Sequence, residues 1–323
     1  MANIVASSKT VLFALPNVED LGQKVANKLK IKLSKISRTE FADGETLLKA
    51  NDTVRSKDVF VLSSNARPVN QNIMELLIFI DSLKRASAKS ITVVISYYGY
   101  ARQDRKAAGR QPIAAKLVAD LLEKAGATKV IALDLHNPSI QGFFNIPVDD
   151  LKGQYVLAPE IKKVGRFTVA SPDHGGAVRA RILAELISNS VDIAIVDKRR
   201  TGPNKSETLG ILGNVKNRNV VIIDDIIDTG GTIIKAAKAL KKAGAKKVIV
   251  AATHGLFTRG FDAFEKSDDI SEVLITDSVP SVRDIKSKKL KVISVAEQLA
   301  KVISATMKSK SVSAMYVKMK KEI

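Results

Sequence analysis

The chain has 323 residues, of which 45% are hydrophobic, so it can bury a core large enough for two domains of ordinary size. It contains no cysteine, which excludes disulfides, thiolate metal sites and a cysteine nucleophile. The net charge of +19, from 52 basic and 33 acidic residues, is compatible with nucleic-acid binding. However, the basic residues are scattered along the chain and only 5% of residues are aromatic, so we expect no nucleic-acid partner.

Nothing near the beginning of the chain has the pattern of a secretory signal. The apolar stretch at 11–15 is short and is followed at once by Pro16. The longest strongly apolar run, at 74–80, is interrupted by Glu75, so we expect no segment that crosses a membrane. These features predict a cytoplasmic protein.

Short apolar strands alternate with helical segments along the first half, a pattern typical of α/β domains with mainly parallel sheets. A strand at 91–98 is followed by a long charged loop at 99–112. A helix ending at Gly126, a second strand and then His136 come next. The segment 146–153 contains proline and glycine between patterned segments, and it predicts a domain boundary nearby.

The second half repeats this pattern. Residues 239–254 align with residues 121–136 without gaps and share nine of 16 positions. A strand at 219–226 precedes the second copy, and the first copy has ten more residues in its loop (spacings of 128 and 118). We therefore predict a duplicated α/β domain, with residues 1–148 as the first domain, 149–304 as the second, and 305–323 as a basic tail that packs on the first.

The two copies differ most in the loop between strand and helix, which in the second half reads DDIIDTGGT at 224–232. Gly230 and Gly231 let the backbone approach a ligand closely, and N–H groups at the start of a helix attract anions. Asp224 and Asp225 lie at the carboxyl end of a parallel strand, where they can accept hydrogen bonds from sugar hydroxyls or hold a metal. The loop predicts a site for a ribose phosphate; the alternative is a capped turn with solvated acids.

At this point the chain resembles the ribose-phosphate pyrophosphokinase family over roughly residues 5–310. Besides the loop, the resemblance rests on segments in the expected order: FADGE (41–45), PVNQNIMELL (68–77), SLKRASAKSITVVISYYGYARQDRK (82–106), VIALDLHNPSIQGFF (130–144), SPDHGGAVRAR (171–181) and DKRRTGPN (197–204). It implies two duplicated phosphoribosyltransferase-like domains, each a mainly parallel sheet flanked by helices. It also implies Mg²⁺-dependent transfer of the diphosphoryl group of ATP to the 1-hydroxyl of ribose 5-phosphate, which yields phosphoribosyl pyrophosphate for nucleotide biosynthesis and releases AMP.

The resemblance further implies roles for individual residues. The ATP-binding residues would be Phe41, Asp43, Glu45, Arg102, Gln103 and Asp104, with the FADGE loop reaching a neighbouring subunit. The ribose 5-phosphate residues would be Asp224, Asp225, Asp228, Thr229, Gly230, Gly231 and Thr232. The magnesium positions would be His136 and Asp173, assisted by Asp134 and His174, and the catalytic cations would be Lys198 and Arg200.

Taken without the resemblance, these segments have plainer interpretations. FADGE would be a turn with an anchoring phenylalanine, and the RQD segment at 102–104 would be a surface salt-bridge loop. His136 would be a polar residue at a strand end, and its repeat counterpart His254 lies where we expect no metal. No residue can be assigned as a general base.

Members of the phosphate-activated class are homo-oligomers, usually hexamers built from dimers, that respond to phosphate and ADP. Thr53, Arg55, Ser311 and Ser313 match the oxyanion site of that class. Gly109 stands where many relatives carry a serine, so phosphate activation and ADP inhibition remain open. The role of the basic tail is also open.

Three alternatives differ from the synthetase interpretation in class. A phosphoribosyltransferase would share the ribose loop but would need a base-binding hood, which the sequence does not indicate. A non-catalytic regulatory relative is disfavoured because Lys198, Arg200, His136 and Asp173 are all present together with the acidic loop. A nucleic-acid binder is motivated by the net charge alone.

Overall fold

The computed structural model describes residues 9–188, 190–199 and 208–323, and the chain divides into two compact units. The first unit takes in residues up to Lys152 with 278–280 and 295–316, and the second takes in 153–277, 281–294 and 317–323. Residues 295–304, which the sequence prediction placed in the second domain, thus belong to the first unit, because helix α8 (Ala296–Met307) packs on helix α1 (Glu19–Leu29).

The first unit contains a sheet of six parallel strands in the order β2–β1–β5–β6–β7–β8. The strands are β2 (Leu33–Ser34), β1 (Thr10–Ala14), β5 (Asp58–Ser63), β6 (Ser90–Ile95), β7 (Lys129–Leu133) and β8 (Val148–Leu151). The central strands are almost wholly buried, as expected for a parallel sheet covered by helices on both faces.

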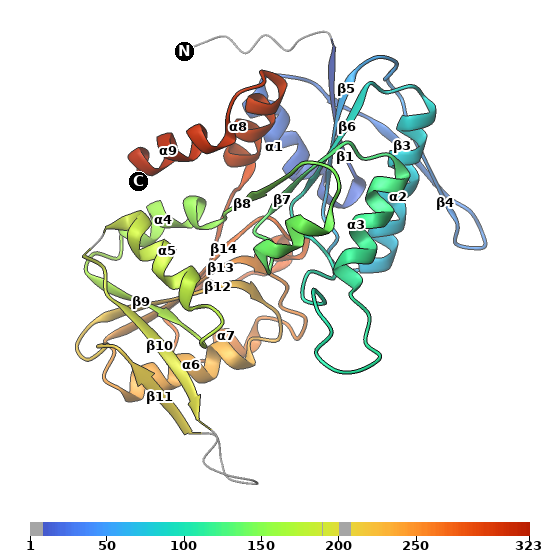
Figure 1. Ribbon diagram of the computed structural model, residues 1–323. Helices are drawn as coiled ribbons and strands as arrows, with labels where there is room; N and C mark the ends of the chain where they lie inside the picture. The colour runs from blue at the N-terminus through green and yellow to red at the C-terminus, as the bar shows by residue number, and fades with distance from the viewer. Residues whose placement is uncertain (1–8, 189, 200–207) are drawn as a thin grey trace. The chain divides into compact units, whose positions relative to one another are not determined.

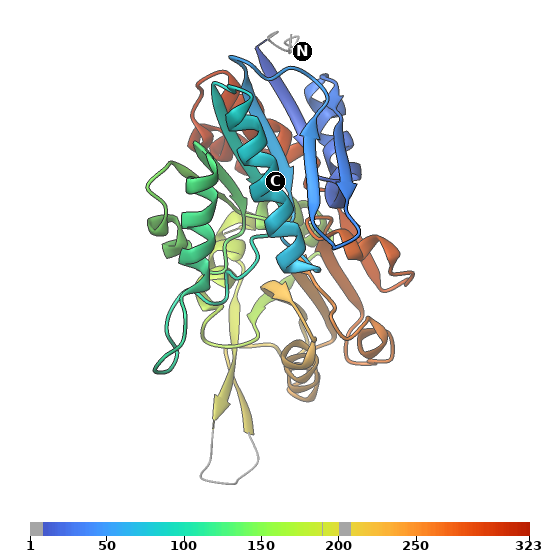
Figure 2. The same ribbon diagram turned by 90° about the vertical axis from the view of Figure 1, so that its right-hand side faces the viewer.

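Helices α2 (Val69–Arg85) and α3 (Ala114–Ala125) cover one face of this sheet, and α1 and α8 lie on the other (Figures 1 and 2). A separate antiparallel hairpin, formed by β3 (Ile36–Glu40) and β4 (Thr46–Ala50), runs beside α2, and its tip projects from the unit (Figure 1). Arg38 of the hairpin bonds Glu75 of α2 at 2.8 Å, which ties the base of the hairpin to the helix. A short 3₁₀ helix, η1 (Pro16–Val18), precedes α1, and another, η2 (Pro138–Phe143), follows β7.

The second unit contains a seven-stranded sheet in the order β11–β10–β9–β12–β13–β14–β15. The strands are β11 (Thr208–Leu212), β10 (Ile193–Arg199), β9 (Phe167–Ser171), β12 (Asn219–Ile227), β13 (Lys247–Gly255), β14 (Glu272–Thr276) and β15 (Leu290–Ile293). All neighbouring pairs are parallel except β10 and β11 at the edge.

Side chains that alternate along the strands form the core of the second unit. Helices α4 (Gln154–Lys162) and α5 (Ala177–Ile187) pack on the face that includes Val221 and Ile223, and α6 (Gly231–Lys242) packs on the opposite face (Figure 1). The remaining helices are the short α7 (Asp262–Glu265), the 3₁₀ helix η3 (Pro280–Asp284) and the C-terminal α9 (Val312–Glu322).

The predicted duplication corresponds to matching strand positions in the two sheets. In the first, β6 lies between β5 and β7, and α3 joins β6 to β7; in the second, β12 lies between β9 and β13, and α6 joins β12 to β13. The predicted fold class, two mainly parallel sheets flanked by helices, is confirmed. None of the described helices combines the length and the apolar character needed to cross a lipid bilayer.

Candidate active site

Strand β12 carries two adjacent carboxylates near its carboxyl end, two residues before the strand stops at Ile227, and they share one guanidinium. Asp225 is 3% exposed, and Asp224 is partly buried. Arg179, on the neighbouring helix α5, has its Nη1 atom 3.2 Å from an Oδ1 atom of each carboxylate. The backbone N–H of Asp225 also donates to Asp224 Oδ1 at 2.9 Å, so the two side chains are held in place before any ligand binds.

The two acids influence each other electrically. Burial raises the pKa of Asp224 above the ordinary carboxyl value, the nearby charge of Asp225 raises it further, and Arg179 opposes both effects. Two close, poorly hydrated carboxylates favour ligands that bring positive charge or several hydrogen-bond donors. Sugar hydroxyls and metal cations are both ligands of this kind.

The predicted phosphate loop follows directly. Gly230 adopts a left-handed backbone conformation, with φ of 80°, and helix α6 starts at the next residue. Thr229, Gly231 and Thr232 are exposed. The first N–H groups of a helix have no partner within the helix, so this exposed turn can receive a phosphate.

An aromatic cluster, formed by Phe257, Phe261 and Phe264, packs against the loop. Its ring centroids lie 5.2–5.5 Å apart, and Phe264 is fully buried. A Cβ atom added to Gly230 would lie 2.4 Å from Phe264 Cε2. Residue 230 must therefore be a glycine for steric as well as conformational reasons.

Asp228 is also fixed within the loop. Its carboxylate accepts a hydrogen bond from the Thr258 hydroxyl at 2.5 Å, and its carbonyl accepts one from the Thr258 N–H at 3.2 Å. The sequence prediction did not include Arg179, Thr258 or Phe264. Their signals are a basic residue in the 171–181 segment and three phenylalanines within eight residues of a chain that has few aromatics.

Asp173 and His174 lie in the loop between β9 and α5. The Asp173 Oδ1 atom accepts a hydrogen bond from the Gly176 N–H at 3.1 Å, and the Asp173 carbonyl accepts one from the Ser171 hydroxyl at 2.6 Å. His174 Nε2 lies 2.8 Å from Asp197 Oδ1 on β10, one residue before Lys198. The structure thus brings the loop of Asp173 close to the strand that leads to the predicted catalytic cations.

Lys198 lies in β10, where its backbone pairs with Leu209 of β11. Arg200, the other predicted catalytic cation, lies outside the described residues. The strand therefore positions the start of the predicted catalytic segment.

In the first unit, two predicted segments meet. His136 is exposed in the loop after β7, and the amide of the next residue, Asn137, donates to Asp104 Oδ2 at 2.6 Å. Arg102 and Gln103 are exposed beside Asp104. The predicted ATP segment RQD and the loop of His136 are therefore neighbours. His254, the repeat counterpart of His136, is instead buried within β13, at 1% exposed.

The FADGE segment forms the tip of the β3–β4 hairpin. The Phe41 N–H donates to the Glu45 carbonyl at 2.8 Å, and Asp43 Oδ1 accepts from the Glu45 N–H at 3.1 Å. Gly44, with φ of 90°, allows the tight turn. Phe41 is 49% exposed, so its ring is not buried as an anchor of the hairpin within this unit.

The predicted effector residues are all exposed and belong to the first unit. Arg55 donates to the Ser87 hydroxyl at 3.3 Å. The Ser311 hydroxyl accepts from the Ala314 N–H at 3.2 Å, in the first turn of α9. Thr53 and Ser313 are exposed near these two residues in the sequence.

The donor set for a metal is small. Within the described ranges, no three His, Cys, Asp or Glu side chains gather closely enough to hold an ion by themselves. The predicted ligands are one exposed imidazole and one partly exposed carboxylate. Mg²⁺ prefers oxygen ligands and is usually held by one or two carboxylates with water and substrate phosphates, so Asp173 fits this ion, whereas an imidazole is an unusual ligand for it.

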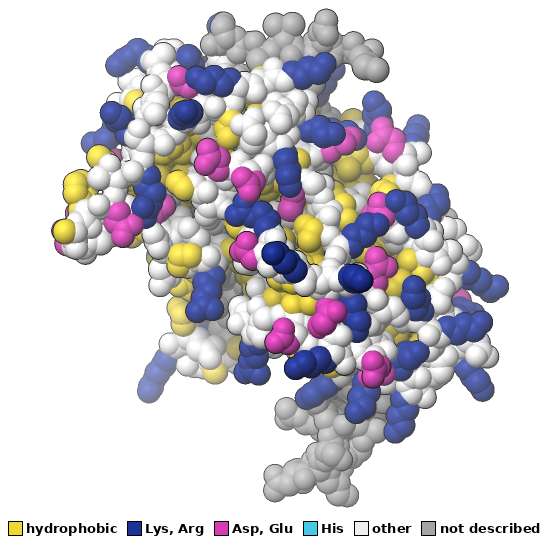
Figure 3. Space-filling view, turned by 180° about the vertical axis from the view of Figure 1, so that it is seen from behind, with side chains coloured by type: hydrophobic (Ala, Val, Ile, Leu, Met, Phe, Trp, Pro, Cys, Tyr) yellow, Lys and Arg dark blue, Asp and Glu magenta, His cyan; other side chains and the backbone are white. Residues whose placement is uncertain are grey.

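Basic side chains do not gather into a single patch on the face drawn in Figure 3. On the face drawn in Figure 3, Lys and Arg side chains are interspersed with acidic ones. Lys163 and Lys291, for example, both pair with Glu160, at 2.7 and 2.6 Å. Basic side chains that are paired in this way contribute less to a field that would attract nucleic acid.

Comparison with known proteins relates both units to one group of enzymes. A family model described as the N-terminal domain of ribose phosphate pyrophosphokinase matches residues 10–126, and a phosphoribosyl transferase domain model matches residues 148–284. The ribose-phosphate pyrophosphokinase of Mycoplasmopsis pulmonis is 60% identical over 312 residues, which cover 96% of this chain and 97% of the relative. That of Mycoplasma pneumoniae is 45% identical over 315 residues, 95% of each chain. The crystal structure of phosphoribosylpyrophosphate synthetase from Mycobacterium smegmatis superposes with a TM-score of 0.88 at 38% identity and covers 94% of this chain and 100% of that one.

Proposed function

The chain belongs to the ribose-phosphate pyrophosphokinase family, and we infer that it transfers the diphosphoryl group of ATP to the 1-hydroxyl of ribose 5-phosphate. The products are phosphoribosyl pyrophosphate and AMP, and the first of these feeds nucleotide biosynthesis. The carboxyl end of β12 and the loop after it support this function most directly, because the carboxylate pair of the strand is followed by an exposed, glycine-containing helix start.

We propose that ribose 5-phosphate binds along this loop. The N–H groups and hydroxyls of 228–232 would hold the 5-phosphate, while Asp224 and Asp225 would accept hydrogen bonds from the ring hydroxyls. Arg179 keeps the two carboxylates in one orientation, so the sugar would meet acceptors that are already positioned. This leaves the 1-hydroxyl free of contacts with the loop and able to react.

ATP would bind to the first unit through the RQD segment and the FADGE hairpin. Arg102 can bond two phosphate oxygens at once, and Gln103 can donate from its amide. The exposed ring of Phe41 can stack on adenine, and Asp43 and Glu45 can accept from its amine or from the ribose. Because Asp104 accepts from Asn137, we assign it the additional task of holding the RQD segment beside the His136 loop.

The metal is proposed to be Mg²⁺, held by His136 and Asp173. When bound, it would neutralise negative charge on the phosphates of the nucleotide. The chain's own contribution is the orientation of the two ligands: the Gly176 N–H fixes one Asp173 oxygen, and the anchored loop after β7 presents His136.

Lys198 and Arg200 are proposed to stabilise the negative charge that develops as the bond between the α- and β-phosphates breaks. No side chain needs to act as a covalent nucleophile, because the sugar hydroxyl attacks phosphorus directly. Charge stabilisation of this type acts mainly on turnover rather than on substrate binding.

We further propose a cytoplasmic homo-oligomer, a hexamer built from dimers. Large apolar side chains on the outer face of the first unit support a subunit contact: Met74, Leu117 and Leu121 are 55%, 58% and 40% exposed. Phosphate and ADP are proposed effectors at Thr53, Arg55, Ser311 and Ser313, and Gly109 leaves the strength of either response to be measured.

The deciding experiment is to incubate the purified protein with ATP, Mg²⁺ and ribose 5-phosphate and to measure AMP and phosphoribosyl pyrophosphate. We expect equimolar formation of both, and no AMP when ribose 5-phosphate is omitted. A phosphoribosyltransferase would instead consume phosphoribosyl pyrophosphate and release pyrophosphate in the presence of a base. Failure to form AMP under saturating substrates and metal would exclude the proposed activity.

A further inference from the structure

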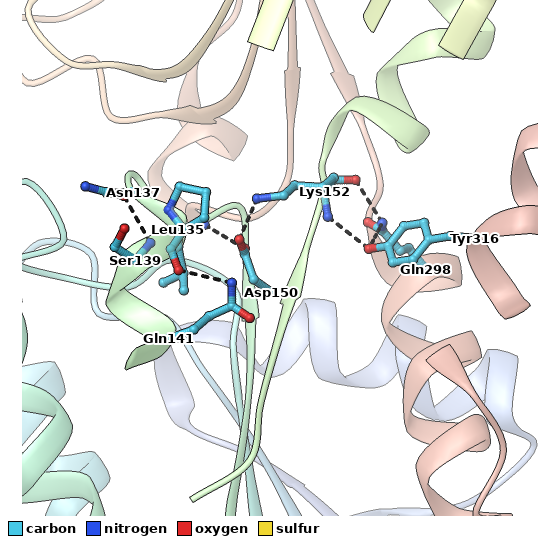
Figure 4. Close-up of polar contacts among 9 residues, drawn as sticks. Leu135, Asn137, Ser139, Gln141, Asp150, Lys152, Gln298 and Tyr316 are labelled. Atoms are coloured by element: carbon cyan, nitrogen blue, oxygen red, sulfur yellow. Dashed lines mark hydrogen bonds and ion pairs between the residues drawn. The ribbon is translucent and has the colours of Figure 1, made fainter. Parts of the chain in front are cut away.

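The loop after β7 is anchored on both sides of His136. On one side, the Leu135 N–H donates to Asp150 Oδ1 at 3.0 Å; on the other, the Asn137 amide donates to Asp104 Oδ2 at 2.6 Å. Figure 4 shows Asp150, on β8, reaching across to Leu135. Two side-chain contacts, at the residues before and after His136, therefore determine how the loop presents the imidazole.

The backbone just before the anchored segment requires such restraint. Asp134 adopts the left-handed conformation, with φ of 51°, which aspartate adopts more readily than most residues but still at some cost in free energy. Its N–H donates to the Leu151 carbonyl at 2.6 Å, so β8 contacts the loop through its backbone as well as through Asp150.

Both oxygens of Asp150 are engaged. The side chain is 3% exposed, Oδ1 accepts from Leu135, and Oδ2 pairs with Lys152 Nζ. Burial raises the pKa of Asp150, whereas Lys152 opposes that shift. A buried carboxylate is tolerated only when it is paired and hydrogen-bonded, so the cation is part of the anchor.

Lys152 is fixed in turn by the last two helices. Its N–H donates to the Tyr316 hydroxyl of α9 at 2.9 Å, and its carbonyl accepts from Gln298 Nε2 of α8 at 2.9 Å (Figure 4). Gln298 Nε2 also lies 3.3 Å from the Tyr316 oxygen. Burial raises the pKa of Tyr316, so its hydroxyl remains neutral at physiological pH.

We propose that Asp150 is a positioning residue for the His136 loop, and that α9 holds Asp150 in place through Tyr316 and Lys152. Besides the predicted oxyanion site at Ser311 and Ser313, this gives the C-terminal tail a task in the presentation of the metal ligand. The link to catalysis rests on the proposed role of His136. The positioning itself can be measured independently, because it concerns the Leu135 amide.

The first test is amide hydrogen exchange in the full-length protein, read at the peptide that contains Leu135. Asp150→Ala removes the acceptor, and we expect exchange of the Leu135 amide to become about tenfold faster. Asp150→Asn keeps an oxygen that can accept from Leu135 but loses the ion pair with Lys152, so its exchange should lie between that of the wild type and that of Asp150→Ala. Tyr316→Phe should accelerate exchange about threefold, because it loosens Lys152 while leaving Asp150 intact.

Thr128→Val is the matched control. Thr128 lies just before β7, at the end of the strand opposite His136, and its hydroxyl makes two hydrogen bonds to Ile91, at 2.9 and 3.0 Å. The Thr128→Val substitution therefore removes two hydrogen bonds beside the same strand and leaves the loop unchanged, so exchange of the Leu135 amide should not change. Wild-type exchange in folded Asp150→Ala, or an equal acceleration in Thr128→Val, would overturn the proposal.

The second test is the Mg²⁺ concentration at half-maximal activity. We expect it to rise about tenfold in Asp150→Ala and less in Asp150→Asn, with a smaller change in the KM for ribose 5-phosphate. A purely structural defect would lower kcat in proportion to the folded fraction and leave the Mg²⁺ requirement unchanged, and that result would also overturn the proposal. An unchanged Mg²⁺ requirement in His136→Ala would contradict the metal assignment alone, since the exchange data at Leu135 still decide the positioning.

Discussion

The substitution Gly230→Ala should lower the free energy of unfolding even when no ligand is bound. The residue combines a left-handed backbone, φ of 80°, with a neighbour that leaves no room for a methyl group. An added Cβ would lie 2.4 Å from Phe264 Cε2 and 2.6 Å from Cζ. Phe264 is fully buried against Phe257 and Phe261, so its ring cannot move aside without disturbing the cluster.

Two costs therefore add in Gly230→Ala. Holding a residue with a Cβ in the left-handed region costs about 1–2 kcal/mol. Forcing a methyl group into a well-packed core costs about 1–3 kcal/mol. The sum, about 2–5 kcal/mol, is a large share of the total stability of about 5–15 kcal/mol that is typical of a folded protein.

Gly231→Ala is the matched control one residue later. Its φ is not left-handed, it is exposed, and the nearest atom to an added Cβ is Thr229 Oγ1, at 3.9 Å. Because alanine favours helices, this variant should be at least as stable as the wild type, by up to about 1 kcal/mol. It should nevertheless raise the KM for ribose 5-phosphate, because the methyl group lies where the backbone would approach the phosphate.

Urea unfolding of the ligand-free proteins measures the first effect, and steady-state kinetics measures the second. A Phe264→Leu background adds a test of mechanism: the extra cost of Gly230→Ala should fall to the backbone part of about 1–2 kcal/mol, because the clash is relieved. A Gly230→Ala protein within about 0.5 kcal/mol of the wild type would refute the reasoning about the cluster. Equal effects of Gly230→Ala and Gly231→Ala on stability would refute it too.

Three further predictions concern charge, turnover and stacking. Asp224 has a folded-state pKa above its unfolded value, so its contribution to stability is present at low pH and is lost as pH rises through the raised pKa. In unfolding experiments without ligand, the wild type should therefore lose stability relative to Asp224→Asn as pH rises from the ordinary carboxyl pKa to the raised one. Lys198→Ala should lower kcat by about a hundredfold or more with a smaller change in either KM, and unchanged turnover would remove its proposed role. Phe41→Ala should raise the KM for ATP about tenfold, whereas Leu47→Ala, on the same hairpin and 51% exposed, should not; equal effects would point to the hairpin as a whole.

The part of the fold that is local in sequence could be predicted. The repeated strand–helix–strand units, the helix ends near Gly126 and Gly244, and the loop before α6 all have signals within about a dozen residues, because hydrophobic periodicity and glycine act over that range. The membership of α8 in the first unit could not be predicted in this way. It depends on the packing of α8 against α1, more than 250 residues away in sequence, as in the ion pair of Lys28 with Glu297 (269 residues apart).

The same distinction applies to the site. Residues that face the substrates carry a recognisable pattern, and the family resemblance assigns them. Other residues hold these in place, come from other elements and carry no pattern of their own. Arg179, which pairs with Asp225, and Asp150, which accepts from Leu135, are examples. A buried arginine or aspartate is indistinguishable in sequence from one on the surface, since only tertiary contacts give it a partner.

The discontinuous make-up of the first unit has a consequence for synthesis on the ribosome. Its sheet is complete once β8 emerges, yet α1 also packs against α8, which lies more than 140 residues further along the chain. The apolar surface of the first unit that α8 covers therefore stays exposed until the residues of the whole second sheet have been synthesised. Chaperone capture during that interval, and poor solubility of a fragment that stops near Lys152, would both follow from the order in which the helices leave the exit tunnel.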